Sequence, residues 1–172
     1  MAAVSEAYAV ESSAPAVQHK TLTVHTVHPL QFLDVTRLIE TAVQQAGLYS
    51  GIVSVQTRHT TTGILINEHE PLLLSDLRAM FERVAPSRAS YAHDDYTRRT
   101  VNLTADERRN GHAHCRAALL RSSETVGVRQ GLLDLGRWQR VIFVEFDGGQ
   151  RRQVGLTMIG TPVPRRGSAS DR

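Results

Sequence analysis

Histidines on three separate segments are the side chains of this sequence best suited to chemistry. His59 lies in R-H-T-T-T-G, His93 in Y-A-H-D-D-Y and His114 in N-G-H-A-H-C. Imidazole is the commonest transition-metal ligand, and catalytic zinc sites often combine three protein ligands with an open fourth position. The sequence therefore allows a three-histidine metal site; the alternative is separate surface or capping histidines, because no local ligand pair fixes a shared site. His112 competes with His114 for one position, since residues two apart on a helix point about 200° apart.

Carboxylates near these histidines could orient the imidazoles or hold a harder ion. Glu68 and its neighbour Asn67 stand at the end of an alternating segment, and Asp94 directly follows His93. Glu145 interrupts the apolar run V-I-F-V-E-F. It points either inward to a cationic partner or ligand, or outward into solvent.

Two arginines, Arg151 and Arg152, open the last alternating segment of the chain. Strand geometry sends their side chains to opposite faces, so at most one of them can join Glu145. A planar guanidinium suits a carboxylate or phosphate partner, because it can donate two parallel hydrogen bonds. We therefore interpret these arginines as candidate anion-binding residues.

Composition and charge exclude several classes of protein. The 172 residues are 41% hydrophobic and 22% charged, which indicates one compact domain. The net charge of +3, with Lys20 as the single lysine and no basic run longer than two residues, argues against nucleic-acid binding. No apolar run approaches the roughly 20 residues of a membrane-spanning helix. P-loop, HExxH, CxxC and GxSxG motifs are missing from the sequence.

The cysteine content and the first residues indicate a cytoplasmic protein. Cys115 is the single cysteine, so it cannot form an internal disulfide, and we expect it to fill an inert, small apolar role. The opening M-A-A-V-S-E-A-Y-A-V-E has acidic residues where a secretory signal would be basic and then apolar.

Periodicity places the chemical residues on a mixture of strands and helices. Alternating segments predict strands at 20–28, 51–60, 62–67, 125–128, 132–135, 138–146 and 152–159. Three- and four-residue spacings predict helices between 34 and 47, between 71 and 86, and at 111–120. The run Asp147-Gly148-Gly149 predicts a hairpin between the last two strands. Strands at both ends with helices between them predict an α+β fold with largely antiparallel sheets.

The ends of the chain differ in composition from its middle. Residues 1–18 and 161–172 lack a regular period, which predicts flexible N- and C-terminal tails around a single domain at 19–160. Residues 86–109 form a long polar connection inside that domain, and connections of this length are usually functional or disordered.

The order of motifs resembles the YjbQ family, which is also catalogued as the UPF0047-type family and as a secondary thiamine-phosphate synthase family. The resemblance covers roughly 20–160. It rests on H-T-T-T-G-I-L-I-N-E, D-L, Y-x-H-D, A-H-C-R-A-A-L-L, V-x-V-x-x-G-x-L-x-L-G-x-W-Q, F-V-E and R-R-x-V-x-x-T-x-x-G. The chain departs from the family pattern at R-N-G-H before Ala113, at Arg137 and at Phe146. These changes bear on substrate identity and metal preference.

The resemblance implies a β-sandwich-like α+β protein that assembles as a homotrimer and carries a divalent metal ion, zinc or magnesium. It further implies that the metal-binding, catalytic and substrate-binding residues share one site. The expected metal ligands are His59, His93 and His114, the expected catalytic carboxylates are Glu68, Asp94 and Glu145, and the expected substrate-binding residues are Asn67, Arg151 and Arg152.

The implied activity joins a hydroxymethylpyrimidine pyrophosphate to a thiazole phosphate and releases pyrophosphate. Imidazole and carboxylate ligands would hold the ion that neutralises the leaving group, and an arginine would bind phosphate oxygens. The alternative is a non-catalytic trimer that binds a metal or a phosphorylated metabolite in the same pocket. For Trp138, packing in a core or an interface is favoured over stacking on a substrate.

Overall fold

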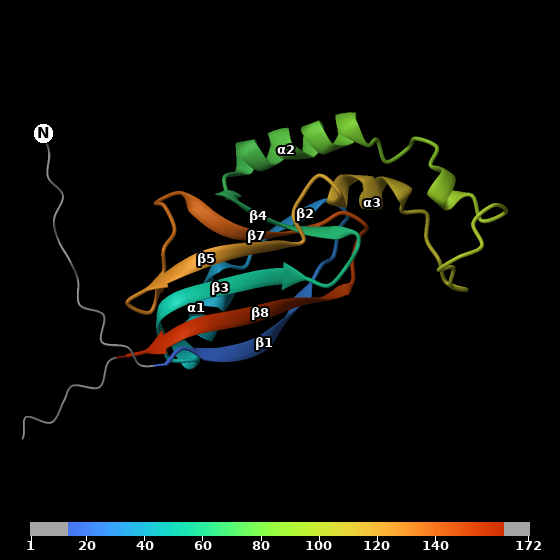
Figure 1. Ribbon diagram of the computed structural model, residues 1–172. Helices are drawn as coiled ribbons and strands as arrows, with labels where there is room; N and C mark the ends of the chain where they lie inside the picture. The colour runs from blue at the N-terminus through green and yellow to red at the C-terminus, as the bar shows by residue number, and fades with distance from the viewer. Residues whose placement is uncertain (1–13, 164–172) are drawn as a thin grey trace, which may run out of the picture.

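The computed structural model describes residues 14–163 and divides their strands between two antiparallel sheets (Figure 1). The five-stranded sheet has the order β1 (Ala16–His25), β8 (Arg151–Pro162), β3 (Leu48–Thr57), β5 (Ser123–Arg129) and β6 (Leu132–Leu133). The three-stranded sheet has the order β2 (Gln31–Asp34), β7 (Gln139–Glu145) and β4 (Thr62–Glu68). The predicted α+β class with antiparallel sheets is confirmed.

The main core lies between the two sheets and is closed by α1 (Thr36–Gln45). Val53 and Leu156 from the five-stranded sheet, Phe143 from the three-stranded sheet and Ile39 from α1 are at most 1% exposed. Burial of each such side chain stabilises the fold by about 1.5–3 kcal/mol. The core therefore holds the two sheets face to face.

A second core covers the other face of the three-stranded sheet. It joins Ile142 and Val144 of β7 to Phe81 of α2 (Pro71–Val84) and Ala113 of α3 (Gly111–Ala117). Figure 1 shows both helices above this sheet, on the side away from the five-stranded sheet. Strand β7 is thus buried on both faces, which explains its unbroken apolar run.

The predicted hairpin between the last two strands is wrong, because β7 and β8 belong to different sheets. The Asp147-Gly148-Gly149 turn instead carries the chain from one sheet to the other. A Cβ at Gly149 would lie 3.1 Å from the Cα of Val27, so the neighbouring backbone would have to shift by a few tenths of an ångström to admit another residue. A glycine-rich turn permits a reversal, but it does not determine which neighbour the next strand joins.

Other predicted boundaries shift by a few residues. β1 begins at Ala16 and β8 ends at Pro162, so some residues of both expected tails belong to strands. The rest of the predicted tails, 1–13 and 164–172, lies outside the described residues. Strand β2 was not predicted. The long connection after α2 contains a short 3₁₀ helix, η1 (Ala92–Asp94).

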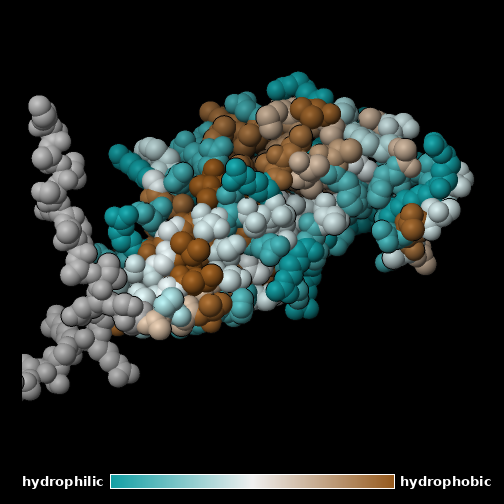
Figure 2. Space-filling view, in the orientation of Figure 1, coloured by the Kyte–Doolittle hydropathy of each residue, from teal (hydrophilic) through white to brown (hydrophobic). Residues whose placement is uncertain are grey.

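The outer face of the five-stranded sheet keeps one apolar row. Val17, Ile159 and Ile52 are register partners on β1, β8 and β3, and they are 58%, 39% and 43% exposed. Figure 2 shows hydrophobic side chains among polar ones on this face. Within 14–163, no helix is long and apolar enough to cross a membrane.

Candidate functional site

A buried ion pair joins the end of β7 to the start of β8. Arg152 donates from Nε and Nη2 to the two carboxylate oxygens of Glu145, at 2.5 and 2.8 Å. Glu145 is 0% exposed and Arg152 is 5% exposed. Of the two orientations considered for Glu145, the structure therefore shows the inward one. Arg151 is exposed, as the alternation of the strand requires.

The remaining bonding capacity of this pair is largely used within the protein. The Glu145 carboxylate also accepts from Thr26 Oγ1 at 3.2 Å and from the backbone N–H of Asp147 at 2.9 Å. The Arg152 guanidinium donates further to Thr61 Oγ1 and to Gln150 Oε1. In this arrangement the pair fixes the junction between the sheets, and Arg152 has no bidentate edge free for a phosphate.

His59 lies beside this ion pair, in the connection between β3 and β4. Its Nε2 accepts the backbone N–H of Gln153 at 3.0 Å, so the neutral ring carries its proton on Nδ1. Partial burial lowers the pKa of His59, and the positive charge of Arg152 lowers it further, against the opposing effect of Glu145. His59 can therefore coordinate a metal through Nε2 only if the bond to Gln153 is released.

His93 and His114 form the closest pair of imidazoles. Their ring centres lie 4.5 Å apart, with the ring planes at 60°. The Nε2 atom of His93 is buried and has no hydrogen-bond partner in the described part of the chain. Burial is the main cause that lowers the pKa of His114, and the neighbouring charge of His93 lowers it further. An unprotonated imidazole beside an unpartnered ring nitrogen can bind a transition metal.

Asp94 fixes the relative position of the two elements that carry this pair. Its Oδ1 accepts the backbone N–H groups of Asn110 and Gly111, at 3.0 and 2.9 Å. These bonds attach η1, which holds His93, to the start of α3, which holds His114. Asp94 thus positions the imidazoles, and one of its oxygens is already occupied.

Asp147 links the histidine pair to the buried ion pair. Its backbone donates to Glu145, while its carboxylate accepts from Asn110 Nδ2 at 3.3 Å and from Arg108 at 3.1 Å. The sequence pattern predicts only a turn at Asp147 and indicates no role for Asn110. The motif R-N-G-H, which spans the start of α3, was the available signal for Asn110, because it departs from the family pattern.

The nine predicted site residues do not meet in one place within this chain. Between residues 14 and 163, no group of three or more His, Cys, Asp or Glu side chains is placed to hold a metal ion. Asn67 and Glu68 lie at the far end of β4 from Thr62, the register partner of Glu145. At about 3.3 Å per residue, that separation is roughly 20 Å.

Three further residues can be compared with their expected surroundings. Cys115 is exposed, so the expected apolar role does not hold. Trp138 is 60% exposed, so it is not a core anchor of this chain. His112 faces Tyr91, with ring centres 6.3 Å apart, and so it is His114 that joins His93.

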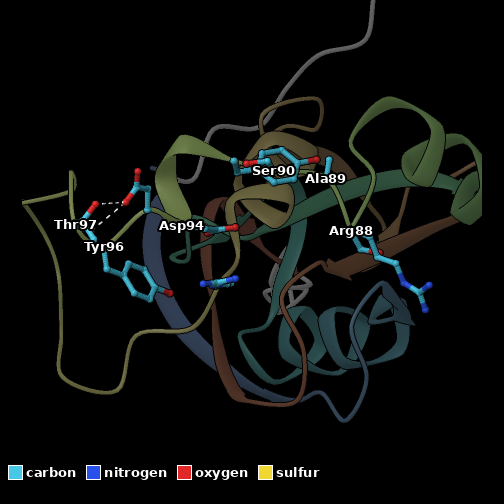
Figure 3. A pocket seen from close by; sticks show the side chains of 10 residues that line it. Arg88, Ala89, Ser90, Asp94, Tyr96 and Thr97 are labelled. Atoms are coloured by element: carbon cyan, nitrogen blue, oxygen red, sulfur yellow. Dashed lines mark hydrogen bonds between the residues drawn. The ribbon is translucent and has the colours of Figure 1, made fainter.

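A cleft of about 630 Å³ opens on the segment between α2 and α3. Asp94 lines it, together with Arg88, Tyr96 and Arg109. Figure 3 shows Tyr96 and Arg88 on opposite sides of Asp94. The aperiodic stretch at 86–109 predicted a loop that is either functional or disordered, and nothing in its pattern identified these lining residues.

The family model described as "UPF0047 protein YjbQ-like" matches residues 20–161. The chain belongs to the YjbQ-like UPF0047 family. A UPF0047 protein of Methanothermobacter thermautotrophicus is 36% identical over 141 residues, which cover 82% of this chain and 91% of that relative. UPF0047 protein YugU of Bacillus subtilis is 33% identical over 142 residues, covering 82% of this chain and 98% of YugU.

Solved structures of the UPF0047 family share the same architecture. A YbjQ-like protein of unknown function from Sulfolobus solfataricus P2 superposes with a TM-score of 0.74 at 29% identity, covering 86% of this chain and all of that protein. An uncharacterised YjbQ/UPF0047 protein from Clostridium acetobutylicum gives a TM-score of 0.70 at 33% identity, covering 81% of this chain and 98% of that one.

Proposed function

We propose that this UPF0047 protein is a metal-dependent transferase of phosphorylated small molecules with thiamine-phosphate synthase-type activity. The observation that carries the proposal is the His93–His114 pair, with ring centres 4.5 Å apart and a buried, unpartnered Nε2 on His93. Buried polar atoms almost always have partners, so a nitrogen without one favours a ligand at this position.

The residues present supply some, but not all, of the ligands that a divalent metal ion needs. His93 and His114 would supply two imidazole nitrogens, and the remaining positions would be open to substrate oxygens or to groups from another chain. Two imidazoles favour zinc over magnesium, because magnesium prefers oxygen ligands. When bound, the ion would supply charge neutralisation to a diphosphate leaving group.

The reaction needs no covalent nucleophile from the protein. The ring nitrogen of the thiazole phosphate attacks the methylene carbon of the hydroxymethylpyrimidine pyrophosphate. The carbon–oxygen bond breaks, and pyrophosphate leaves with the electron pair. The chain has to hold two anionic substrates and align the nitrogen, the carbon and the leaving oxygen.

Arginines near the histidine pair are placed to bind the anionic groups. Arg109 lines the cleft, and the guanidinium of Arg108 lies 3.1 Å from Asp147, which also contacts the start of α3. Arg108 is half exposed and can turn toward a phosphate. The role of Arg152 in this proposal is positional, because its guanidinium is bonded to Glu145, Thr61 and Gln150.

Assembly of copies would extend the site. A homotrimer is the proposed state, and the exposed apolar row of Val17, Ile159 and Ile52 supports burial of this sheet face between copies.

A single-turnover assay with both thiamine precursors tests the proposed function. We expect wild-type protein to form thiamine phosphate and pyrophosphate, and His93→Ala and His114→Ala to form neither. His69→Ala is the matched control, since His69 is exposed and lies outside the site. Binding of the precursors without product would favour the alternative, a non-catalytic binding protein. Full activity in both histidine variants would contradict the proposal.

A further inference from the structure

Trp138 is the single tryptophan of the chain, and it stands exposed just before β7. Strand β7 begins here, at the end of the three-stranded sheet opposite to Glu145. The Arg137 guanidinium lies 4.6 Å from the centre of the indole ring. The ring is therefore open to solvent and already has a cation against it.

Two shallow hollows meet at this indole. One, of about 330 Å³, is lined by Asn67, Glu68, Arg137 and Trp138, among others. The other, of about 230 Å³, is lined by Glu68, Pro71, Trp138 and Arg140, among others. Trp138 and Glu68 line both hollows, so a ligand in either one lies beside both residues.

The Glu68 carboxylate is the free acidic group of this place, which Arg137 and Arg140 also line. It is exposed and has no hydrogen bond or ion pair with the described residues of the chain. The Glu70 carboxylate is occupied by the backbone N–H groups of Leu72 and Leu73, where it caps α2. The Arg140 guanidinium donates to the Gln139 carbonyl at 2.7 Å.

We propose that Trp138 and Glu68 form a binding site for a small organic cation, such as a quaternary ammonium group. A cation over an indole face is attracted by the ring quadrupole, and the carboxylate adds a direct charge interaction. Arg137 occupies part of the ring, which leaves the second hollow, walled by Pro71, for the ligand. This site is separate from the histidine pair and does not depend on the proposed transferase activity.

Fluorescence excited at a wavelength that the four tyrosines do not absorb reports on this site alone, because Trp138 is the single tryptophan of the chain. The probe is choline, and its neutral isostere 3,3-dimethylbutan-1-ol is the matched control ligand. We expect a saturable fluorescence change with choline and none over the same concentrations with the alcohol. The absence of a saturable change, or an equal response to both compounds, would overturn the proposal without any variant.

Variants then test the role of the carboxylate. Glu68→Gln should bind choline about tenfold more weakly, as expected for the loss of a charge interaction near 1.4 kcal/mol. Glu68→Asp keeps the charge and should retain more of the affinity. Glu124→Gln removes a carboxylate elsewhere and should bind choline as tightly as wild type. His114→Ala should also bind choline as tightly as wild type, and this result would separate the cation site from the proposed transferase site. Wild-type affinity in a folded Glu68→Gln protein would contradict the proposal.

Discussion

The Glu145 carboxylate and the Arg152 guanidinium form a two-bond ion pair between residues that belong to different sheets. Glu145 is the last residue of β7 in the three-stranded sheet, and Arg152 is the second residue of β8 in the five-stranded sheet. Only the connection from Phe146 to Gln150 separates the two strands. The ion pair therefore holds the point where the chain crosses from one sheet to the other.

Replacing one partner of this pair should strongly destabilise the fold. Arg152→Gln leaves the buried Glu145 carboxylate without its cation, and the free energy of unfolding should fall by about 3–5 kcal/mol. Urea denaturation of the purified variant measures this change.

The matched control is Arg129→Gln, which removes an exposed ion pair with Asp134 on the surface. It should cost less than about 1 kcal/mol. Equal losses in the two variants would show that burial of the Glu145–Arg152 pair does not matter.

Replacing Asp94 should weaken metal binding, because its Oδ1 accepts the backbone N–H groups that attach η1 to α3. Asp94→Ala releases η1 from α3, so the His93 and His114 rings lose their fixed separation. Loss of such a supporting contact typically lowers metal affinity about 10–100-fold. Zinc titration by calorimetry measures the affinity.

Asp95→Ala is the control for this prediction, because the Asp95 carboxylate contacts only Thr97 and Arg98 of its own turn among the described hydrogen bonds and ion pairs. It should leave zinc affinity close to that of the wild type. If Asp94→Ala also bound zinc as tightly as wild type, Asp94 would have no positioning role.

The metal-free protein should lose stability as the pH falls below neutrality, and His59 should contribute to that loss. Its pKa lies below the ordinary value of 6.5 in the folded state, mainly because of burial. Between these two values the unfolded chain binds more protons, so stability is complete above about pH 6.5 and falls as the pH drops toward the folded pKa.

Denaturation at pH 7.5 and 5.5, with a chelator present, should show a smaller pH effect in His59→Gln than in wild type. His112 and His114 also have lowered pKa values, chiefly from burial, and their contribution to the pH effect on stability is the same in both proteins. His28→Gln is the control, since His28 is exposed. An unchanged pH effect in His59→Gln would contradict the account of its environment.

Local sequence patterns predicted elements well and their partners poorly. The helix between Pro71 and Pro86 was predicted from the three- and four-residue spacing and from a proline suited to its first turn, and α2 occupies that range. Strand β2 was missed, because four residues are too few for an alternating pattern to stand out.

The failed hairpin has a different cause. β7 is buried on both faces, so its apolar run carries no alternation that would indicate its sheet. The parity of Arg151 and Arg152 did predict that only one of them could reach Glu145, because that relation depends on strand geometry alone.

For the candidate site too, the sequence predicted residue types but not their arrangement in space. The residue types predicted the imidazoles, but sequence spacing could not show that Gln153 would occupy His59 Nε2. Nor could it show that Glu68 would lie at the far end of β4 from Glu145. Both facts follow from how β4, β7 and β8 are arranged in space.

The metal content of the histidine variants tests the central claim most directly. Wild-type protein incubated with zinc and passed through a desalting column should retain about one zinc ion per chain or per shared site by elemental analysis. His93→Ala and His114→Ala, folded by circular dichroism, should retain none, while His69→Ala retains the wild-type amount. Undiminished zinc in both His93→Ala and His114→Ala would contradict the account.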